Sequence, residues 1–234
     1  MGLLSGLLDV VYPPACLGCG TLLEATRDFC SECELTVERL EGRPACPRCG
    51  EPRPQLETCV RCRSQPPPFS RAFSAFLHQG AVARAVHRFK YEDHPELAPG
   101  LVELLAYEGR DFLLEAPSTL CAIPLHPRRF RARTYDQARL LAGCLGRLTG
   151  RSVLHHALRR TRVTRRQVGL DEKGRELNVA AAFAADADAV RNRSILLLDD
   201  VFTTGATARA AAHALKVAGA AEVAVVTLAR AAAG

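Results

Sequence analysis

The chain has 234 residues, which is enough for one medium-sized domain and a smaller one. Its hydrophobic fraction of 48% allows a sizeable core, and no apolar run is long enough to span a bilayer. The apolar stretch at residues 1–11 lacks a basic region and contains Asp9, so we expect a cytoplasmic protein with an amphipathic first helix rather than a signal peptide.

The formal net charge of +6 is unevenly distributed along the chain. Residues 126–175 contain fourteen Arg and Lys residues against three Asp and Glu residues, so the remainder of the chain is net acidic. This concentration predicts an anionic partner, either a polyphosphate or a nucleic acid. A solvated arginine-rich surface is the simpler alternative.

Eight of the ten cysteines form four Cys-x-x-Cys pairs within residues 16–62. This pattern is a strong zinc signal, because one pair holds an ion from a tight turn and a second pair completes the tetrahedron. In a reducing compartment disulfides are rare. Eight thiolates suit two structural zinc ions, bound either by sequential pairs or by interleaved ones. The simpler, sequential assignment puts Cys16, Cys19, Cys30 and Cys33 at one site and Cys46, Cys49, Cys59 and Cys62 at the other.

Changes in amino-acid composition divide the chain into three parts. Residues 1–63 read as an N-terminal helix and a double zinc-ribbon module, residues 64–68 as a Pro-rich linker, and residues 69–234 as a larger domain. The elements expected in the larger domain are a strand in 69–77, helices in 81–90 and 97–107, a strand at 120–123, a helix in 136–148, a strand beginning at 153, an arginine-rich loop over 159–178, a strand at 195–198, a helix from 208 to about 218 and a strand at 222–228. Alternating strands and helices predict an α/β fold with a mainly parallel sheet covered on both faces.

The most informative stretch is 195–207, where four aliphatic residues precede Asp199, Asp200 and a Gly/Thr turn. A strand that opens through such a turn onto a helix N-terminus builds an anion site. The neighbouring carboxylates suit hydroxyl groups or a cation. The two acids could simply cap the helix, but a cap does not require the additional Thr-Thr-Gly-x-Thr pattern. A phosphate and vicinal hydroxyls together describe a phosphorylated ribose.

This stretch resembles the phosphoribosyl-pyrophosphate (PRPP) loop of type I phosphoribosyltransferases. The resemblance implies that Asp199 and Asp200 are catalytic and hold the ribose 2′- and 3′-hydroxyls, while the turn wraps the 5′-phosphate. The remaining PRPP-binding residues implied by it are Val201, Thr203, Thr204, Gly205, Ala206 and Thr207.

Two further segments resemble parts of the same enzymes. Residues 123–129 resemble the loop that meets the pyrophosphate, with Pro124 at its start and Arg128 and Arg129 as catalytic positive charges. The basic stretch 159–175, which includes Arg165 and Arg175, resembles the lid that closes over the site. The resemblance also implies that Mg²⁺ accompanies PRPP and stabilises the leaving pyrophosphate.

From residues 7–19 to residues 227–230 the chain resembles the ComF family, also called the competence protein F or GntX group. This family joins a cysteine zinc module to a Rossmann-like type I phosphoribosyltransferase domain. The resemblance includes Phe89-Lys90-Tyr91. It departs at Arg133-Thr134-Tyr135-Asp136-Gln137, where the family has Arg-Gly-Phe-Asn-Gln; the change alters the turn and adds a negative charge.

Three functions are compatible with these motifs. The first is a phosphoribosyltransferase that uses PRPP and an unidentified acceptor. The second, implied by the family's association with natural transformation, is a non-catalytic protein that binds single-stranded DNA during uptake, together with proteins of the competence machinery. The third is a regulator that senses PRPP without chemistry.

Overall fold

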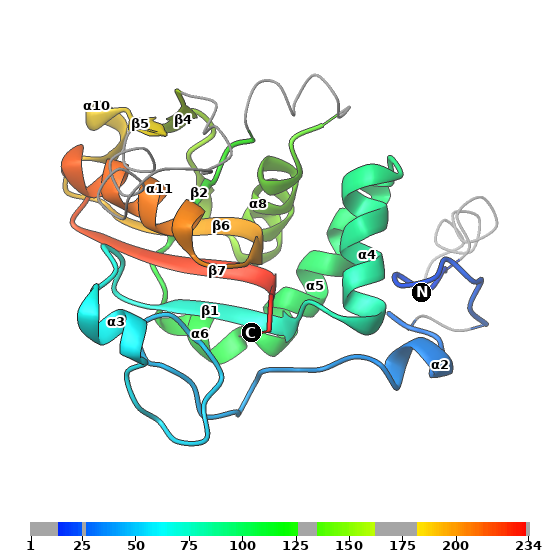
Figure 1. The fold of residues 1–234 in the computed structure, drawn as a ribbon. Helices are drawn as coiled ribbons and strands as arrows, with labels where there is room; N and C mark the ends of the chain where they lie inside the picture. Colours follow the sequence, from blue (N-terminus) through cyan, green and yellow to red (C-terminus); the bar gives the residue numbers. More distant parts are fainter. Residues whose placement is uncertain (1–13, 25–26, 126–134, 162–181, 233–234) are drawn as a thin grey trace, which may run out of the picture.

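The computed structural model describes residues 14–24, 27–125, 135–161 and 182–232 (Figure 1). Its central sheet has five strands in the order β1-β7-β6-β2-β3, and every neighbouring pair is parallel. The strands are β1 (Ala72–Leu77), β7 (Glu222–Arg230), β6 (Ser194–Phe202), β2 (Thr119–Ala122) and β3 (Ser152–Val153). The parallel sheet predicted from the sequence is therefore confirmed.

Helices cover both faces of this sheet (Figure 1). One face is covered by α4 (Gly80–Tyr91), α5 (Ala98–Glu108) and α8 (Gln137–Thr149), and the other by α11 (Ala206–Val217). The shorter helical segments are α2 (Ser31–Glu34), α3 (Val60–Ser64), η1 (Pro95–Leu97), α6 (Arg110–Glu115) and α10 (Ala187–Val190). In the described ranges, no helix has the length and apolar character needed to cross a bilayer.

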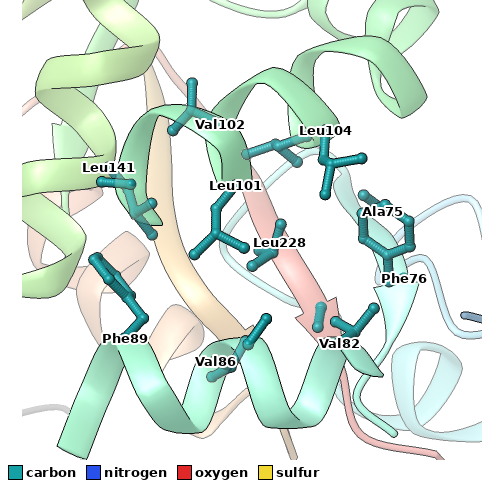
Figure 2. Close-up of a cluster of buried hydrophobic side chains, with 14 of the residues drawn as sticks. Ala75, Phe76, Val82, Val86, Phe89, Leu101, Val102, Leu104, Leu141 and Leu228 are labelled. Atoms are coloured by element: carbon teal, nitrogen blue, oxygen red, sulfur yellow. The ribbon is translucent and has the colours of Figure 1, made fainter. Parts of the chain in front are cut away.

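The core follows from the periodicity of the elements. Along β6, Leu196 and Leu198 pack toward α4, α5 and α8, whereas Ile195 and Leu197 pack toward α11. Figure 2 shows the first of these clusters, in which side chains of α4 and α5 meet Leu228 of β7. Each fully buried aliphatic side chain contributes about 1.5–3 kcal/mol. The helical stripe predicted for α4 is buried as expected: Val82, Ala85, Val86 and Phe89.

Strand β6 is longer than the sequence suggested. The aliphatic run ends at Leu198, but the backbone continues in parallel register with β7 as far as the Phe202–Arg230 pair. Asp199 and Asp200 therefore lie within a paired strand rather than just after it. The predicted end of this strand at residue 198 was wrong. The length of a strand depends on pairing with the neighbouring backbone, and the run of apolar side chains carries no information about that pairing.

A second, two-stranded antiparallel sheet joins β4 (Leu158–Arg160) to β5 (Phe183–Ala185). The sequence predicted an irregular loop from residue 159 onward, so the start of that loop is corrected to a strand. Its formation has a packing reason, because Leu158 and Phe183 are buried in the cluster on the α11 side. Residues 162–181 of the predicted loop lie outside the described residues.

The cysteine-rich segment runs along the larger domain from α2 to α3 (Figure 1). Between these helices it pairs with the free edge of β1, through an antiparallel bridge from Arg39 to Phe76. The Leu40 N–H donates to the Ala75 carbonyl at 2.9 Å, and the Leu77 N–H donates to the Glu38 carbonyl at 2.9 Å. The segment thus forms part of the packing of the sheet.

Candidate functional site

The junction between β6 and α11 is a tight turn built on Gly205. This glycine has a φ of +78° and precedes the first residue of the twelve-residue helix. A Cβ placed there would lie 2.6 Å from Cζ of Phe202, so the turn needs glycine both for its conformation and for space. The Ala206 N–H donates to Oγ1 of Thr204 at 3.3 Å. Unpaired N–H groups and the helix dipole at such a terminus attract anions.

A cavity of about 20 Å³ lies at this turn. It brings together most of the residues that the PRPP-loop resemblance singled out, together with three others. The lining residues are Asp199, Val201, Phe202, Thr203, Gly205, Thr207, Ala208 and Thr227. A carboxyl group, three threonines and a helix N-terminus therefore surround one small space at the carboxyl end of the sheet, where parallel α/β folds bind ligands.

The two adjacent aspartates occupy different surroundings. Neighbouring residues of a strand point to opposite faces, and accordingly Asp199 lines the cavity whereas Asp200 faces α4. There, Nζ of Lys90 lies 2.8 Å from Oδ1 of Asp200, with 16% and 11% of the two side chains exposed. Lys90 was not among the site residues predicted from the sequence. The resemblance of Phe89-Lys90-Tyr91 to the family could have pointed to Lys90. It gave no indication that the partner of Lys90 would be Asp200, 110 positions further along the chain.

Burial of the Asp199 carboxyl, followed by the charge of Asp200, raises the pKa of Asp199 to about 8. The Asp200 N–H, which donates to Oδ1 of Asp199 at 2.9 Å, lowers this pKa, as do the charges of Lys90 and Arg160. These pKa-lowering interactions do not cancel the effects of burial and of the Asp200 charge, which raise the pKa. The raised pKa favours the neutral acid form of Asp199 in the ligand-free site, and a neutral acid can donate a hydrogen bond as well as accept one.

The segment after β2 lies next to β6 at the same edge of the sheet. The Ile123 N–H donates to the Leu198 carbonyl at 2.9 Å, and Pro124 follows in a buried position. Asp136 caps α8 by accepting from the Arg139 N–H at 3.2 Å. Its other oxygen lies 3.4 Å from the Leu125 N–H, so this acid joins the start of the loop to the helix that follows. Four predicted site residues lie outside the described residues: Arg128, Arg129, Arg165 and Arg175.

The eight paired cysteines form two clusters, and within each cluster all Sγ atoms lie within 4.8 Å of one another. The Sγ atoms of Cys19 and Cys30 are 3.8 Å apart, and those of Cys49 and Cys59 are 3.7 Å apart. Zn–S bonds of about 2.3 Å in a tetrahedron give edges of about 3.8 Å, so the clusters fit zinc. The grouping is sequential, as the simpler prediction had it: Cys16, Cys19, Cys30 and Cys33, then Cys46, Cys49, Cys59 and Cys62.

Both clusters are built in the same way. In the first, the Gly20 N–H donates to the Cys16 carbonyl at 2.8 Å, and the Cys30 N–H donates to the Cys16 Sγ at 3.3 Å. The second repeats the turn at Gly50, and the Cys59 N–H donates to the sulfur of the first cysteine at 3.3 Å. Backbone N–H donors of this kind stabilise thiolates, the form that binds metal.

Comparison with known proteins agrees with this arrangement. Residues 7–63 match the family model of the double zinc ribbon domain, and residues 155–234 match that of the phosphoribosyl transferase domain. The chain is 30% identical over 224 residues to competence protein F of Haemophilus influenzae, covering 92% of this chain and 96% of that protein. The chain belongs to the ComF family. The resemblance drawn from its motifs is thereby confirmed.

Two other relatives agree with this assignment. The DNA utilization protein YhgH of Escherichia coli (strain K12) is 32% identical over 207 residues, covering 86% of this chain and 90% of that protein. Competence protein ComFC of Bacillus subtilis (strain 168) is 26% identical over 200 residues, covering 83% and 80%. Among solved structures, the allosteric regulatory enzyme of purine biosynthesis superposes with a TM-score of 0.43 at 20% identity, over 60% of this chain and 29% of that one. That likeness is weak, and the fold assignment rests on the family model and the strand order.

Proposed function

We propose that this ComF-family protein binds PRPP at the junction of β6 and α11. The observation that carries the proposal is the cavity of about 20 Å³ lined by Asp199, Gly205 and Thr207, because it combines a carboxyl group with a helix N-terminus. The turn from Thr203 to Thr207 would hold the 5′-phosphate through N–H and hydroxyl donors. Asp199 and Asp200 would accept hydrogen bonds from the ribose hydroxyls.

Positive charge for the pyrophosphate is proposed to come from two sources. Lys90 lies within the described site, 2.8 Å from Asp200. Arg128 and Arg129, which follow Pro124 in sequence, and Arg165 and Arg175 of the basic segment are assigned to the same task by resemblance alone. Mg²⁺ prefers substrate phosphates and a few carboxylates over a protein cage, so we propose that it arrives on the pyrophosphate of PRPP.

The reaction that fits this site is transfer of the ribosyl group to an unidentified acceptor. A nucleophilic atom of the acceptor bonds to C1 of the ribose, the bond from C1 to the pyrophosphate oxygen breaks, and pyrophosphate leaves with the bonding electrons. The acceptor then loses its proton. PRPP binding without pyrophosphate release for any acceptor would instead identify a PRPP sensor.

Thermal unfolding with PRPP and MgCl₂ tests the proposal directly. At a ligand concentration one hundred times Kd, binding stabilises the folded state by about 2.7 kcal/mol, which raises Tm by roughly 5–10 °C for a chain of this size. Asp199→Asn should lose this shift. Asp188→Asn, at an exposed position in α10, is the matched control and should keep it. An unchanged Tm of the wild-type protein at millimolar PRPP would refute PRPP binding.

The two cysteine clusters are proposed to bind one structural zinc ion each, since every ligand position is a thiolate and none is left open for substrate. Reduced thiolates of this kind favour a cytoplasmic location.

A second candidate function is binding of single-stranded DNA together with competence-machinery proteins. It is favoured by the fourteen Arg and Lys residues within 126–175 and by the similarity to the DNA utilization protein YhgH. Binding through phosphate contacts weakens steeply as salt increases. Titration of fluorescent oligonucleotides at several salt concentrations tests this function, and affinity that does not fall with salt would count against it.

A further inference from the structure

The second cysteine cluster lies directly beside the phosphate loop. Arg61 stands between the ligands Cys59 and Cys62, and its Nη1 donates a hydrogen bond to the carbonyl oxygen of Thr204 at 2.8 Å. In the opposite direction, Nη1 of Arg209 in α11 donates to the carbonyl oxygen of Gln65 at 2.9 Å. Two guanidinium groups thus connect this cluster with the loop and with the helix that follows it.

The bond to Thr204 bears on the orientation of one peptide group. In a trans peptide, the C=O of one residue and the N–H of the next point in opposite directions, and the described chain contains no cis peptide bond. Arg61 holds the Thr204 carbonyl toward the cysteine cluster, so the N–H of Gly205 points away from it.

The two cavities beside the loop agree with this orientation. A cavity of about 190 Å³ is lined by Arg61, Thr204 and Arg209, among others, and does not include Gly205. The cavity of about 20 Å³ is lined by Gly205 and Thr207 and does not include Thr204. Because Arg61 holds the Thr204 carbonyl on the side of the first cavity, we infer that the Gly205 N–H faces the second, which is the space assigned to the 5′-phosphate.

Arg61 is itself held in place by the cluster. It belongs to the five-residue helix α3, which begins after Cys59 and contains Cys62. A helix this short has little stability of its own. Its position depends on the two ligands and on the Cys59 N–H, which donates to Sγ of Cys46 at 3.3 Å. The first cluster instead contacts α4, where Nη1 of Arg88 donates to the Cys16 carbonyl at 3.2 Å.

We infer that Arg61 is a positioning residue through which the second zinc ribbon, and not the first, sets the geometry of the phosphate loop. The expected effect of Arg61 on ligand binding rests on the proposed PRPP site. The expected effect of Arg61 on the conformation of the loop does not depend on any ligand. Zinc in the second cluster then acts on phosphate binding at a distance, by fixing the helix that carries Arg61.

Arg61→Ala and Arg63→Ala form a matched pair of variants of the full-length, zinc-loaded protein, since both side chains are exposed on α3. Without PRPP, amide hydrogen exchange in the peptide covering 199–208 should be faster in Arg61→Ala and unchanged in Arg63→Ala. With MgCl₂, Kd for PRPP should rise about tenfold in Arg61→Ala, the effect expected for loss of one charge-assisted hydrogen bond. Arg61→Lys, which keeps one donor, should restore part of the affinity.

The outcomes separate this inference from the proposed function. Equal exchange and equal PRPP affinity in Arg61→Ala and Arg63→Ala would overturn the inference, as would loss of zinc from Arg61→Ala, because the change in the loop would then follow from an empty metal site. If the wild-type protein does not bind PRPP but Arg61→Ala still speeds exchange in the loop, the proposed function fails and the positioning role stands.

Discussion

Replacement of Gly205 by alanine should destabilise the protein strongly, for two reasons that can be separated. The φ of +78° costs an L-residue about 1–2 kcal/mol. The new Cβ would also lie 2.6 Å and 2.8 Å from two ring atoms of Phe202. That ring is only 6% exposed and packs edge-on against Phe69, so it cannot easily move away. Overpacking of this kind costs about 1–3 kcal/mol, which brings the expected loss to about 2–5 kcal/mol.

Gly150→Ala is the control for the backbone contribution. Gly150 ends α8 with a φ of +67°, and a Cβ there would meet nothing within 4 Å. This variant should therefore lose only the backbone cost, about 1–2 kcal/mol. Urea unfolding of the ligand-free protein measures both variants on one scale. The reasoning is refuted if Gly205→Ala is as stable as Gly150→Ala.

Three further predictions concern the same region and the metal sites. Lys90→Met should lower the free energy of unfolding by about 2–4 kcal/mol, because it leaves the largely buried Asp200 carboxylate without its cation. Adding Asp200→Asn to this variant should recover most of the lost stability. Additive effects of the two substitutions on the free energy of unfolding would contradict the pairing. Since the pKa of Asp199 rises from 3.8 to about 8 on folding, the folded protein keeps a proton that the unfolded chain releases, so this acid removes stability as pH increases from about 4 to 8. Asp199→Asn should remove this part of the pH dependence, measured as the free energy of urea unfolding from pH 5 to 8.5, and identical profiles for the two proteins would argue against the raised pKa. Zinc released on denaturation, measured with a chromogenic chelator, should amount to two ions per chain for the wild type and one for Cys49→Ser. Two ions in that variant would contradict the role of Cys49 as a zinc ligand.

Features encoded by local spacing were predictable from the sequence. The helical stripe that includes Val82 and Phe89 is buried in α4, because a period of 3.6 residues defines one face without reference to the rest of the fold. The cysteine clusters were predictable for the same reason, since each Cys-x-x-Cys pair forms its own turn.

Features that depend on distant partners were not predictable. The end of β6 at Phe202 depends on pairing with Arg230 of β7. The β4–β5 pair joins segments separated by the basic stretch, and its residues carry no alternating pattern long enough to identify a strand. Arg61 reads as one more surface arginine until the fold brings it to Thr204, 143 positions further along the chain.

The bridge between Arg39 and Phe76 places β1 between β7 on one side and the cysteine-rich segment on the other. An uncovered edge strand is a template for pairing with other molecules, and proteins that leave one exposed tend to aggregate. The cysteine-rich segment precedes β1 in the chain and leaves the ribosome first, so a metal-loaded segment would be ready to cover this edge as soon as the strand forms. Loss of zinc would then reduce solubility during synthesis, before any effect on ligand binding could be observed.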